Sequence, residues 1–507
     1  MSFFKNILYS ESYRKGMILS VGFNIFSKGL QFLVPLCIAF YFGSNPETDI
    51  YFYINTTVLI WVAYINNIDN AVLVPEIMRL KHQGDEVEHK RFINFFFYIY
   101  VLIGILGVIV LVVFNTQLYS AISRFSSTQI EEHRTMFLIS SIYFLFLIII
   151  NYLVNILTSL KYFTLPMILS AANSVIVILA IVIAHKQLGT TGIVIGATVA
   201  QFLNLMFLLI LMKTKLKWKF SNVPKFSAIR KKVWKDIVWV ELGQVTAFVT
   251  GYLPVYLLSG YGGAITALTY GKTIADIPNS LLTNQYNFIL GIKFNELYHK
   301  LKLKELGDTF VKGGKILLLL LIPISCFFAF HSTEIVRLVY EHGSFNKADV
   351  RSTATFLSIF ALATPLFAIG ALITRLCFAA QRAKFIFFYQ TVSNIILIAA
   401  ILIATNYSAI YGYGYGYLAF NILNIIGSYF VVRYIFPELK YEHLLFYYVP
   451  VLLLFLAIST GLYTLHLNRG NYLYFTLDLI IYCISILFLS RKWLNPIISK
   501  YKNKMTF

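Results

Sequence analysis

Seven charged side chains inside long apolar segments of this sequence are candidates for a function, since a charge there requires a partner or a water-filled cavity. They are Lys28, Asp69, Glu241, Lys272, Asp276, Arg375 and Asp478. Two ammonium groups facing a common cavity would suit an anionic diphosphate. Lys28 and Lys272 are the candidates for this role, because they fall on the first and second spans of two similar halves. Such helices are expected to face each other across a central cavity.

Simpler interpretations of these charges stay open. A lysine near a span end can extend its ammonium group to the membrane surface, and Lys272 can pair with Asp276, four residues further along the same helix face. Arg375 falls near the inner end of its span, which favours the first interpretation. Asp69 can line the mouth of a pathway or lie at the membrane interface, and Asp478 has no evident partner.

Glu241 and Asn394 are candidates for a site that couples transport to a cation, Na⁺ or H⁺. Hard cations prefer carboxylate and amide oxygens, and Glu241 lies one turn inside the seventh apolar segment. The membrane potential is the alternative driving force. The sequence contains no nucleotide-binding loop, metal-ligand cluster or nucleophile–base constellation, and the four cysteines have no metal or disulfide spacing. We therefore expect a transporter rather than an enzyme, and no cofactor.

The segments that position these residues are predicted transmembrane helices. The chain is 58% hydrophobic and only 13% charged, with a mean hydropathy of +0.73. A helix needs about 20 apolar residues to cross the hydrocarbon layer. The sequence predicts an all-α polytopic membrane protein with about 14 spans, at 17–43, 50–74, 92–115, 136–160, 164–185, 190–213, 236–258, 264–290, 312–332, 350–378, 385–405, 414–434, 445–467 and 472–490.

Basic residues alternate between rich and poor loops along this series of spans. If the N-terminus is cytoplasmic, the inner loops and tails hold 32 of the 42 Lys and Arg residues, and the outer loops hold 7. Basic side chains near span ends favour the cytoplasmic side. The bias predicts a multi-pass protein of the bacterial inner membrane with both termini cytoplasmic. It also explains the net charge of +20 without a nucleic-acid partner.

An internal repeat divides the chain. Residues 170–184 and 391–404 each place one Asn ahead of an Ile-rich run that ends in Ala. Six spans separate the copies, so the two halves have the same orientation, as in parallel repeats about an axis normal to the membrane. We predict an N-lobe at 1–212, a basic cytoplasmic linker at 213–235, a C-lobe at 236–440, and spans thirteen and fourteen with a basic tail at 441–507.

Several stretches, in order along the chain, resemble the MurJ family of lipid II flippases. These include Phe26-Ser27-Lys28, Phe42-Gly43, Thr48-Asp49, Val74-Pro75, residues 162–166, residues 192–201, residues 267–270, and Phe378-Ala379-Ala380. The resemblance implies fourteen helices in two lobes around a cationic, inward-facing cavity, with the last two helices forming a groove for a lipid tail. It implies no nucleotide hydrolysis.

The resemblance also implies a set of substrate-binding residues. Lys28 matches a family arginine, and Asp49 matches the aspartate before span two. The span-eight arginine falls at Thr273, with Lys272 adjacent. Two other family arginines have no counterpart, one of them falling at Val34. Because lysine offers only a point charge where arginine binds a phosphate with two hydrogen bonds, the missing arginines weaken the case for lipid II itself.

The predicted function is a flippase that moves a polyprenyl-diphosphate-linked saccharide, a lipid II-like peptidoglycan precursor, from the cytoplasmic to the outer face by alternating access. One alternative is a Wzx-type flippase for exopolysaccharide or O-antigen repeat units. Another is a multidrug/cation antiporter of the same superfamily. A membrane glycosyltransferase or polymerase is disfavoured, because the outer loops are short. The expected partners are the lipid-linked substrate and membrane lipids, and a monomer is compatible with the sequence.

Overall fold

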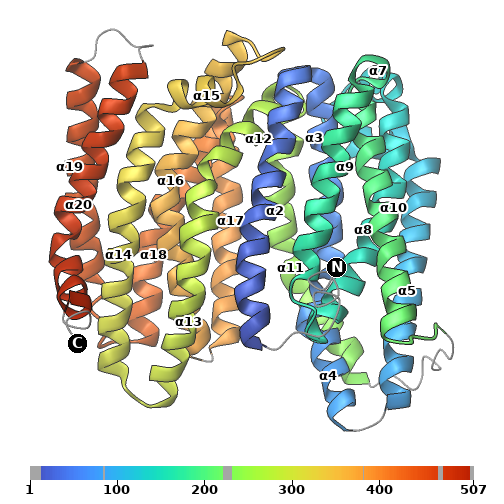
Figure 1. The fold of residues 1–507 in the computed structure, drawn as a ribbon, viewed down its shortest axis with the longest axis horizontal. Coiled ribbons are helices and arrows are strands. Elements are labelled where there is room, and N and C mark those ends of the chain that lie inside the picture. Colours follow the sequence, from blue (N-terminus) through green and yellow to red (C-terminus); the bar gives the residue numbers. More distant parts are fainter. Residues whose placement is uncertain (1–12, 84–85, 221–230, 381, 466–471, 503–507) are drawn as a thin grey trace. The chain divides into compact units, whose positions relative to one another are not determined.

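The computed structural model describes residues 13–83, 86–220, 231–380, 382–465 and 472–502. Every regular element in this part of the chain is a helix (Figure 1). Eleven of the described helices are long and apolar enough to cross a membrane. The predicted all-α polytopic class is confirmed. The count of about 14 is not, because the predicted spans 236–258, 264–290 and 472–490 fall on helices that do not meet both criteria.

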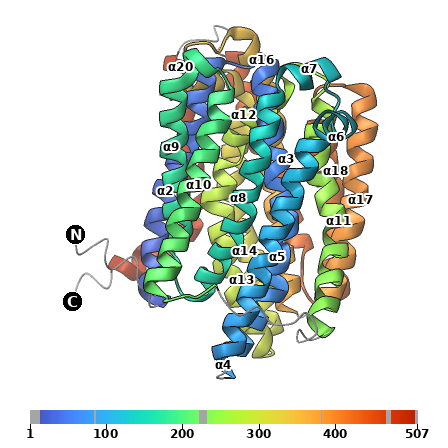
Figure 2. The same cartoon turned by 90° about the vertical axis from the view of Figure 1, so that its right-hand side faces the viewer.

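The chain divides into two compact units, of which the first contains residues 1–266 and the segment 342–346. Figure 2 shows several of its long helices side by side, including α5, α8 and α10. Its helices are α2 (Tyr13–Phe42), α3 (Pro46–Ile68), η1 (Asp69–Leu73), α4 (Val74–His82), α5 (Glu86–Val113), α6 (Asn115–Ile122), α7 (Ser127–Glu132), α8 (Arg134–Ser159), α9 (Leu165–Leu188), α10 (Thr191–Lys215) and α11 (Lys231–Leu258).

The second unit contains residues 267–341 and 347–507. Within it, α14 packs on α16 and α19, and α17 packs on α18. Its helices are α12 (Ala264–Ala275, which begins in the first unit), η3 (Asn279–Thr283), α13 (Asn284–His299), α14 (Leu303–Phe330), α15 (Ser332–Tyr340), α16 (Lys347–Ala379), α17 (Ala383–Tyr407), α18 (Gly412–Ile435), α19 (Glu442–Leu465) and α20 (Tyr472–Lys502).

Helix α11 packs with the first unit, although the predicted C-lobe begins at residue 236. Phe248 of α11 lies against Trp61 of α3, with ring centroids 4.8 Å apart. The hydroxyls of Tyr252 on α11 and Tyr53 on α3 lie within hydrogen-bonding distance of each other and of the backbone carbonyl of Ile122. The predicted lobe boundaries stay a prediction, and residues 221–230 of the predicted linker lie outside the described part of the chain.

Glycine pairs bring two helices into close contact near the end of each predicted lobe. In α10, a Cβ added at Gly192 would lie 3.1 Å from the Cβ of Ala184 on α9, and Gly196 faces Ala180 one turn away. In α18, Cβ atoms at Gly412 and Gly416 would each lie 2.5 Å from a backbone atom of α17. Small residues spaced four apart allow helices to approach in this way. The matching arrangement supports the predicted internal repeat.

The second predicted span of each half is interrupted by a π-helical turn. In the first unit, η1 separates α3 from α4 and is followed by Pro75. In the second, η3 separates α12 from α13 and follows Pro278. Proline lacks the amide donor of a regular helix turn, and π-helical turns often occur at functional sites. Both interruptions lie close to intramembrane carboxylates.

A short loop between α15 and α16 belongs to the first unit, although both helices belong to the second. Within this loop, Ser344 donates from its backbone amide to the carbonyl of Phe40 (2.8 Å) and from its hydroxyl to the carbonyl of Tyr41 (3.0 Å). Gly343 has φ +63°, and a Cβ there would collide with the Phe40 carbonyl. Only glycine fits this turn without strain.

Candidate functional site

Lys28 lies on α2 and is exposed. Its Nζ donates to Gln31 Oε1 (3.3 Å), and Gln31 in turn donates to Ser170 Oγ on α9 (2.6 Å). The lysine has no carboxylate partner among the described residues. The Gln31–Ser170 hydrogen bond joins this part of α2 to α9, and the predicted contact of Lys28 with an anion stays a prediction.

Lys272 lies on α12 and forms an ion pair with Asp276, with 2.9 Å between Nζ and Oδ2. The pairing considered from the sequence is therefore present. Gly271 allows α12 to approach α16 closely, since a Cβ there would lie 2.8 Å from the carbonyl oxygen of Thr353. Both charged side chains remain about half exposed, at 45% and 49%.

Thr273, the neighbouring candidate, directs its hydroxyl into its own helix. Its Oγ1 donates to the backbone carbonyl of Thr269 (2.7 Å). Serine and threonine often make this bond within helices. The structure gives Thr273 a local contact and leaves its predicted role in substrate binding a prediction.

Asp49 is buried, with 1% of its surface exposed. Its Oδ1 accepts hydrogen bonds from the backbone amide of Thr266 (2.8 Å) and from the Thr266 hydroxyl (2.7 Å). Thr266 is in the first turn of α12, whose amides have no partner within the helix. Asp49 therefore caps the start of the helix that carries Lys272. This contact gives Asp49 a positioning role, and direct contact with substrate stays a prediction.

Glu241 lies on α11, and both of its carboxylate oxygens are shielded from solvent. Tyr64 of α3 is its neighbour and donates to the Glu241 backbone carbonyl (3.3 Å). Asn394 lies half-buried on α17, in the second unit. Glu241 and Asn394 belong to different units, and joint cation binding by the two residues stays a prediction. So does joint anion binding by Lys28 and Lys272.

Asp69 is the centre of a buried polar network that the sequence does not predict. The carboxylate is 1% exposed and accepts from Tyr100 Oη (2.5 Å), Asn155 Nδ2 (2.9 Å) and Asn66 Nδ2 (3.0 Å). Tyr100 stacks on Tyr152, with ring centroids 4.7 Å apart. Asp69 is therefore enclosed within the first unit and does not line an open mouth, one of the two places considered from the sequence. Three donors satisfy its charge inside the first unit.

Asp478, which has no evident partner in the sequence, lies 3.4 Å from His331 Nε2. The carboxylate is on α20, and the histidine is at the junction of α14 and α15. Phe327 and Phe475 surround the imidazole. The pair connects two elements of the second unit. Among the described residues, no group of three or more His, Cys, Asp or Glu side chains could hold a metal ion.

Comparison with known proteins identifies relatives along most of the chain. The model of the family described as lipid II flippase MurJ matches residues 38–483. A probable lipid II flippase MurJ of Borreliella burgdorferi is 23% identical over 431 residues, covering 83% of this chain and 84% of that protein. One from Aquifex aeolicus is 23% identical over 385 residues, or 73% of each chain.

Solved structures show the same fold. A structure of lipid II flippase MurJ in an inward closed conformation matches with a TM-score of 0.80 and 19% identity, covering 95% of this chain and all of the other. An inward-facing multidrug resistance transporter of the MATE family matches with a TM-score of 0.65 and 13% identity, covering 81% of this chain and 96% of that one. At these identities the structures establish the fold alone.

Proposed function

The chain belongs to the MurJ family of lipid II flippases, and on this premise we propose that it flips a polyprenyl-diphosphate-linked saccharide, a lipid II-like peptidoglycan precursor, across the inner membrane. The headgroup moves from the cytoplasmic to the outer face by alternating access, with both chain termini in the cytoplasm. The family match along residues 38–483 carries the proposal. Family membership also confirms the prediction of a transporter rather than an enzyme.

Lys28 is the residue we assign to the first contact with the diphosphate. Its ammonium group is exposed and makes no ion pair in the described part of the chain, and Gln31 and Ser170 hold its helix in place. An ammonium group at membrane depth is costly unless it meets an anion or water. A lipid diphosphate entering from the membrane supplies that anion.

Lys272 is the second diphosphate contact, and Asp276 keeps its charge compensated while substrate is absent. The incoming diphosphate replaces the Asp276 carboxylate as the partner of Lys272. Because the two side chains are about half exposed, an anion can reach Lys272 beside its carboxylate partner. Once displaced, the negative carboxylate of Asp276 repels the bound diphosphate. This repulsion favours release of the substrate, which a transporter requires.

The return of the empty transporter requires an energy source other than nucleotide hydrolysis. One charge moved through 100 mV of membrane potential supplies about 2.3 kcal/mol. A cation held by Glu241 and Asn394 is the second source that we propose. The shielded carboxylate of Glu241 supports it, because such a group gains from a bound Na⁺ or H⁺.

The alternative functions receive less support. The matching family model is that of MurJ, and the MATE multidrug transporter matches the fold with a TM-score of 0.65, against 0.80 for the MurJ structure. A Wzx-type flippase for exopolysaccharide shares the diphosphate chemistry and differs in the sugar. The experiment below separates the two substrates.

The test is rescue of a bacterium depleted of its own lipid II flippase, with outward-facing lipid II measured alongside growth. Wild-type chain is expected to restore both, and Lys28→Ala to reduce lipid II export at least about tenfold, since it removes a charge-assisted contact. Lys300→Ala, which removes a paired surface lysine, is the control and should rescue fully. Failure of well-inserted wild-type protein, with accumulation of a different lipid-linked oligosaccharide in cells lacking it, would reject lipid II as the substrate.

A further inference from the structure

A cavity of about 500 Å³ opens at the end of the second unit where α14 begins and where α18 is followed by α19. Lys304, Lys312 and Lys315 of α14 line one side. Lys440 and His443, at and just after the connection to α19, line the other. In the predicted topology this end faces the cytoplasm. None of these residues belongs to the candidate site described above.

Helix geometry explains why the lysines converge on the cavity. Residues 304, 308, 312 and 315 are separated by four, four and three positions, so they lie on one face of α14. The walls are fixed by packing, because Gly307 faces Leu439 and Gly314 faces Leu444. Lys315 also lies over the ring of Tyr447 on α19, with 5.5 Å from Nζ to the ring centroid. The cavity is therefore built by α14 and α19 together.

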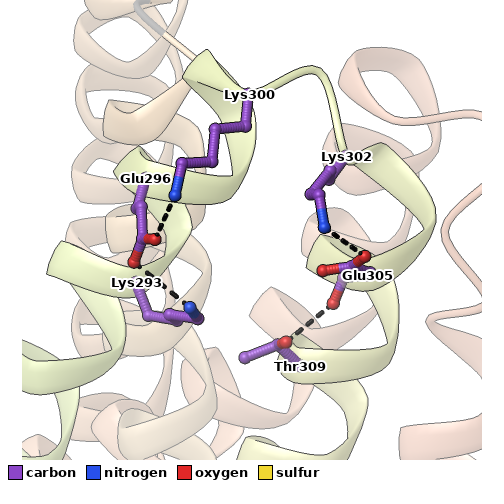
Figure 3. A network of polar contacts seen from close by, with 6 residues as sticks. All are labelled: Lys293, Glu296, Lys300, Lys302, Glu305 and Thr309. Carbon is purple, nitrogen blue, oxygen red and sulfur yellow. Dashed lines mark hydrogen bonds and ion pairs between the residues drawn. The ribbon is translucent and has the colours of Figure 1, made fainter.

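The charges of the cavity are not neutralised by its own residues. Asp308 and Glu438 also line it, so four lysines face two carboxylates. None of the four lysines makes an ion pair with a described residue. At the neighbouring turn between α13 and α14, Lys293 and Lys300 both pair with Glu296, at 3.1 and 2.7 Å (Figure 3). The four unpaired lysines of the cavity therefore leave an excess of positive charge around an open space, and a bound anion would compensate this charge.

The wall above the cavity is apolar. From His443, helix α19 continues with Phe446, Leu453 and Leu454 on the same or the adjoining face, at 76%, 60% and 43% exposure. A free phosphate ion would gain nothing from this surface, whereas the chain of a lipid would cover it. Basic pockets beside membrane helices on the cytoplasmic side commonly bind lipid headgroups.

We propose that this cavity binds the phosphate-bearing headgroup of a membrane lipid, whose apolar chain lies along α19. Lys312 and Lys315 contact the phosphate from α14, and Lys440, in the segment between α18 and α19, contacts it from the opposite side. Two lipids carry this chemistry: an anionic glycerophospholipid of the leaflet, which would regulate or anchor the second unit, and a polyprenyl diphosphate. The proposal does not depend on which substrate is transported.

The experiment is native mass spectrometry of the purified full chain, titrated separately with phosphatidylglycerol and with undecaprenyl diphosphate. Each lysine beside an anionic headgroup is worth about a factor of five in affinity. K312Q/K315Q is therefore expected to bind the preferred lipid roughly 25-fold more weakly. The matched control K293Q/K300Q removes two lysines from the same unit outside the cavity and should change binding by less than about twofold.

The result of the two titrations shows which of the two lipids binds in the cavity. A loss confined to phosphatidylglycerol identifies a leaflet lipid, and a loss confined to undecaprenyl diphosphate identifies the polyprenyl carrier; either supports the site. Equal binding by wild type and K312Q/K315Q, an equal loss in the control, or full displacement by the same concentration of inorganic pyrophosphate would overturn it. Lys440→Gln, in the connection, keeps the test valid if the double variant does not fold. Because the readout is lipid binding, it is independent of transport.

Discussion

The second predicted span of each half combines a π-helical turn with an intramembrane carboxylate, but the two regions treat the charge differently. In the first unit, Asp69 begins η1 and is sealed by Tyr100, Asn66 and Asn155. In the second, Asp276 precedes η3 and forms a half-exposed pair with Lys272. The carboxylate beside the π-helical turn is therefore part of a buried hydrogen-bond network in the first unit and of a half-exposed ion pair in the second. Accessibility, more than charge, separates structural from substrate-binding candidates.

The strongest test of this difference is to remove each carboxylate. Asp69→Ala removes the acceptor that three buried donors share, and Tyr100 and Asn66 keep only contacts of 3.4 Å to backbone carbonyls. Each unsatisfied buried group costs about 1–3 kcal/mol. We expect a loss of about 3–6 kcal/mol, measured as a large fall in the thermal unfolding temperature in detergent. Asp276→Ala, the matched control, removes one partner of a half-exposed ion pair and should cost less than Asp69→Ala. Equal losses in the two variants would show that burial does not distinguish them.

An intermediate loss of stability is expected for Asp49, which is buried and accepts hydrogen bonds from the first turn of α12. Asp49→Ala removes the acceptor for the Thr266 amide and should cost about 1–2 kcal/mol. Asp49→Asn keeps an oxygen acceptor and should retain most of the stability and the transport. The measurement combines thermal unfolding with lipid II export. An Asn variant that is as stable as wild type but as inactive as the Ala variant would show that the charge itself contacts substrate.

The smallest effect is expected for an exposed carboxylate outside the predicted membrane spans, where water can reach its ion pairs. Glu296 is on the predicted inner loop, and hydrogen bonds from Lys300 and then Lys293 lower its pKa below the usual 4.5. Its contribution is therefore present above pH 4.5 and is lost as the pH falls through the lowered value. Surface ion pairs contribute little, so Glu296→Gln should leave the unfolding temperature at pH 7 unchanged within about 1 °C. A larger fall would contradict the ranking by accessibility.

The sequence predicts the features that depend on residues close together along the chain. Apolar length locates eleven helices that meet the criteria for spans, and four-residue spacing predicts the pair of Lys272 with Asp276. Contacts between distant residues were not predictable. Tyr100 and Asn155 are 31 and 86 positions from Asp69, and His331 is far from Asp478. The order of the spans along the chain likewise could not show that α11 packs on α3, because helices that follow one another in sequence need not be neighbours in space.

The loop at residues 342–346 has a consequence for the timing of synthesis. Its contacts with Phe40 and Tyr41 complete the first unit, but the ribosome makes it only after the remainder of that unit ends at Thr266. Elongation proceeds at about 5–20 residues per second. The end of α2 therefore waits for several seconds without this covering segment, while helices of the second unit are already being inserted. The first unit is begun first, yet it is completed only after residues 267–341 of the second unit have been made.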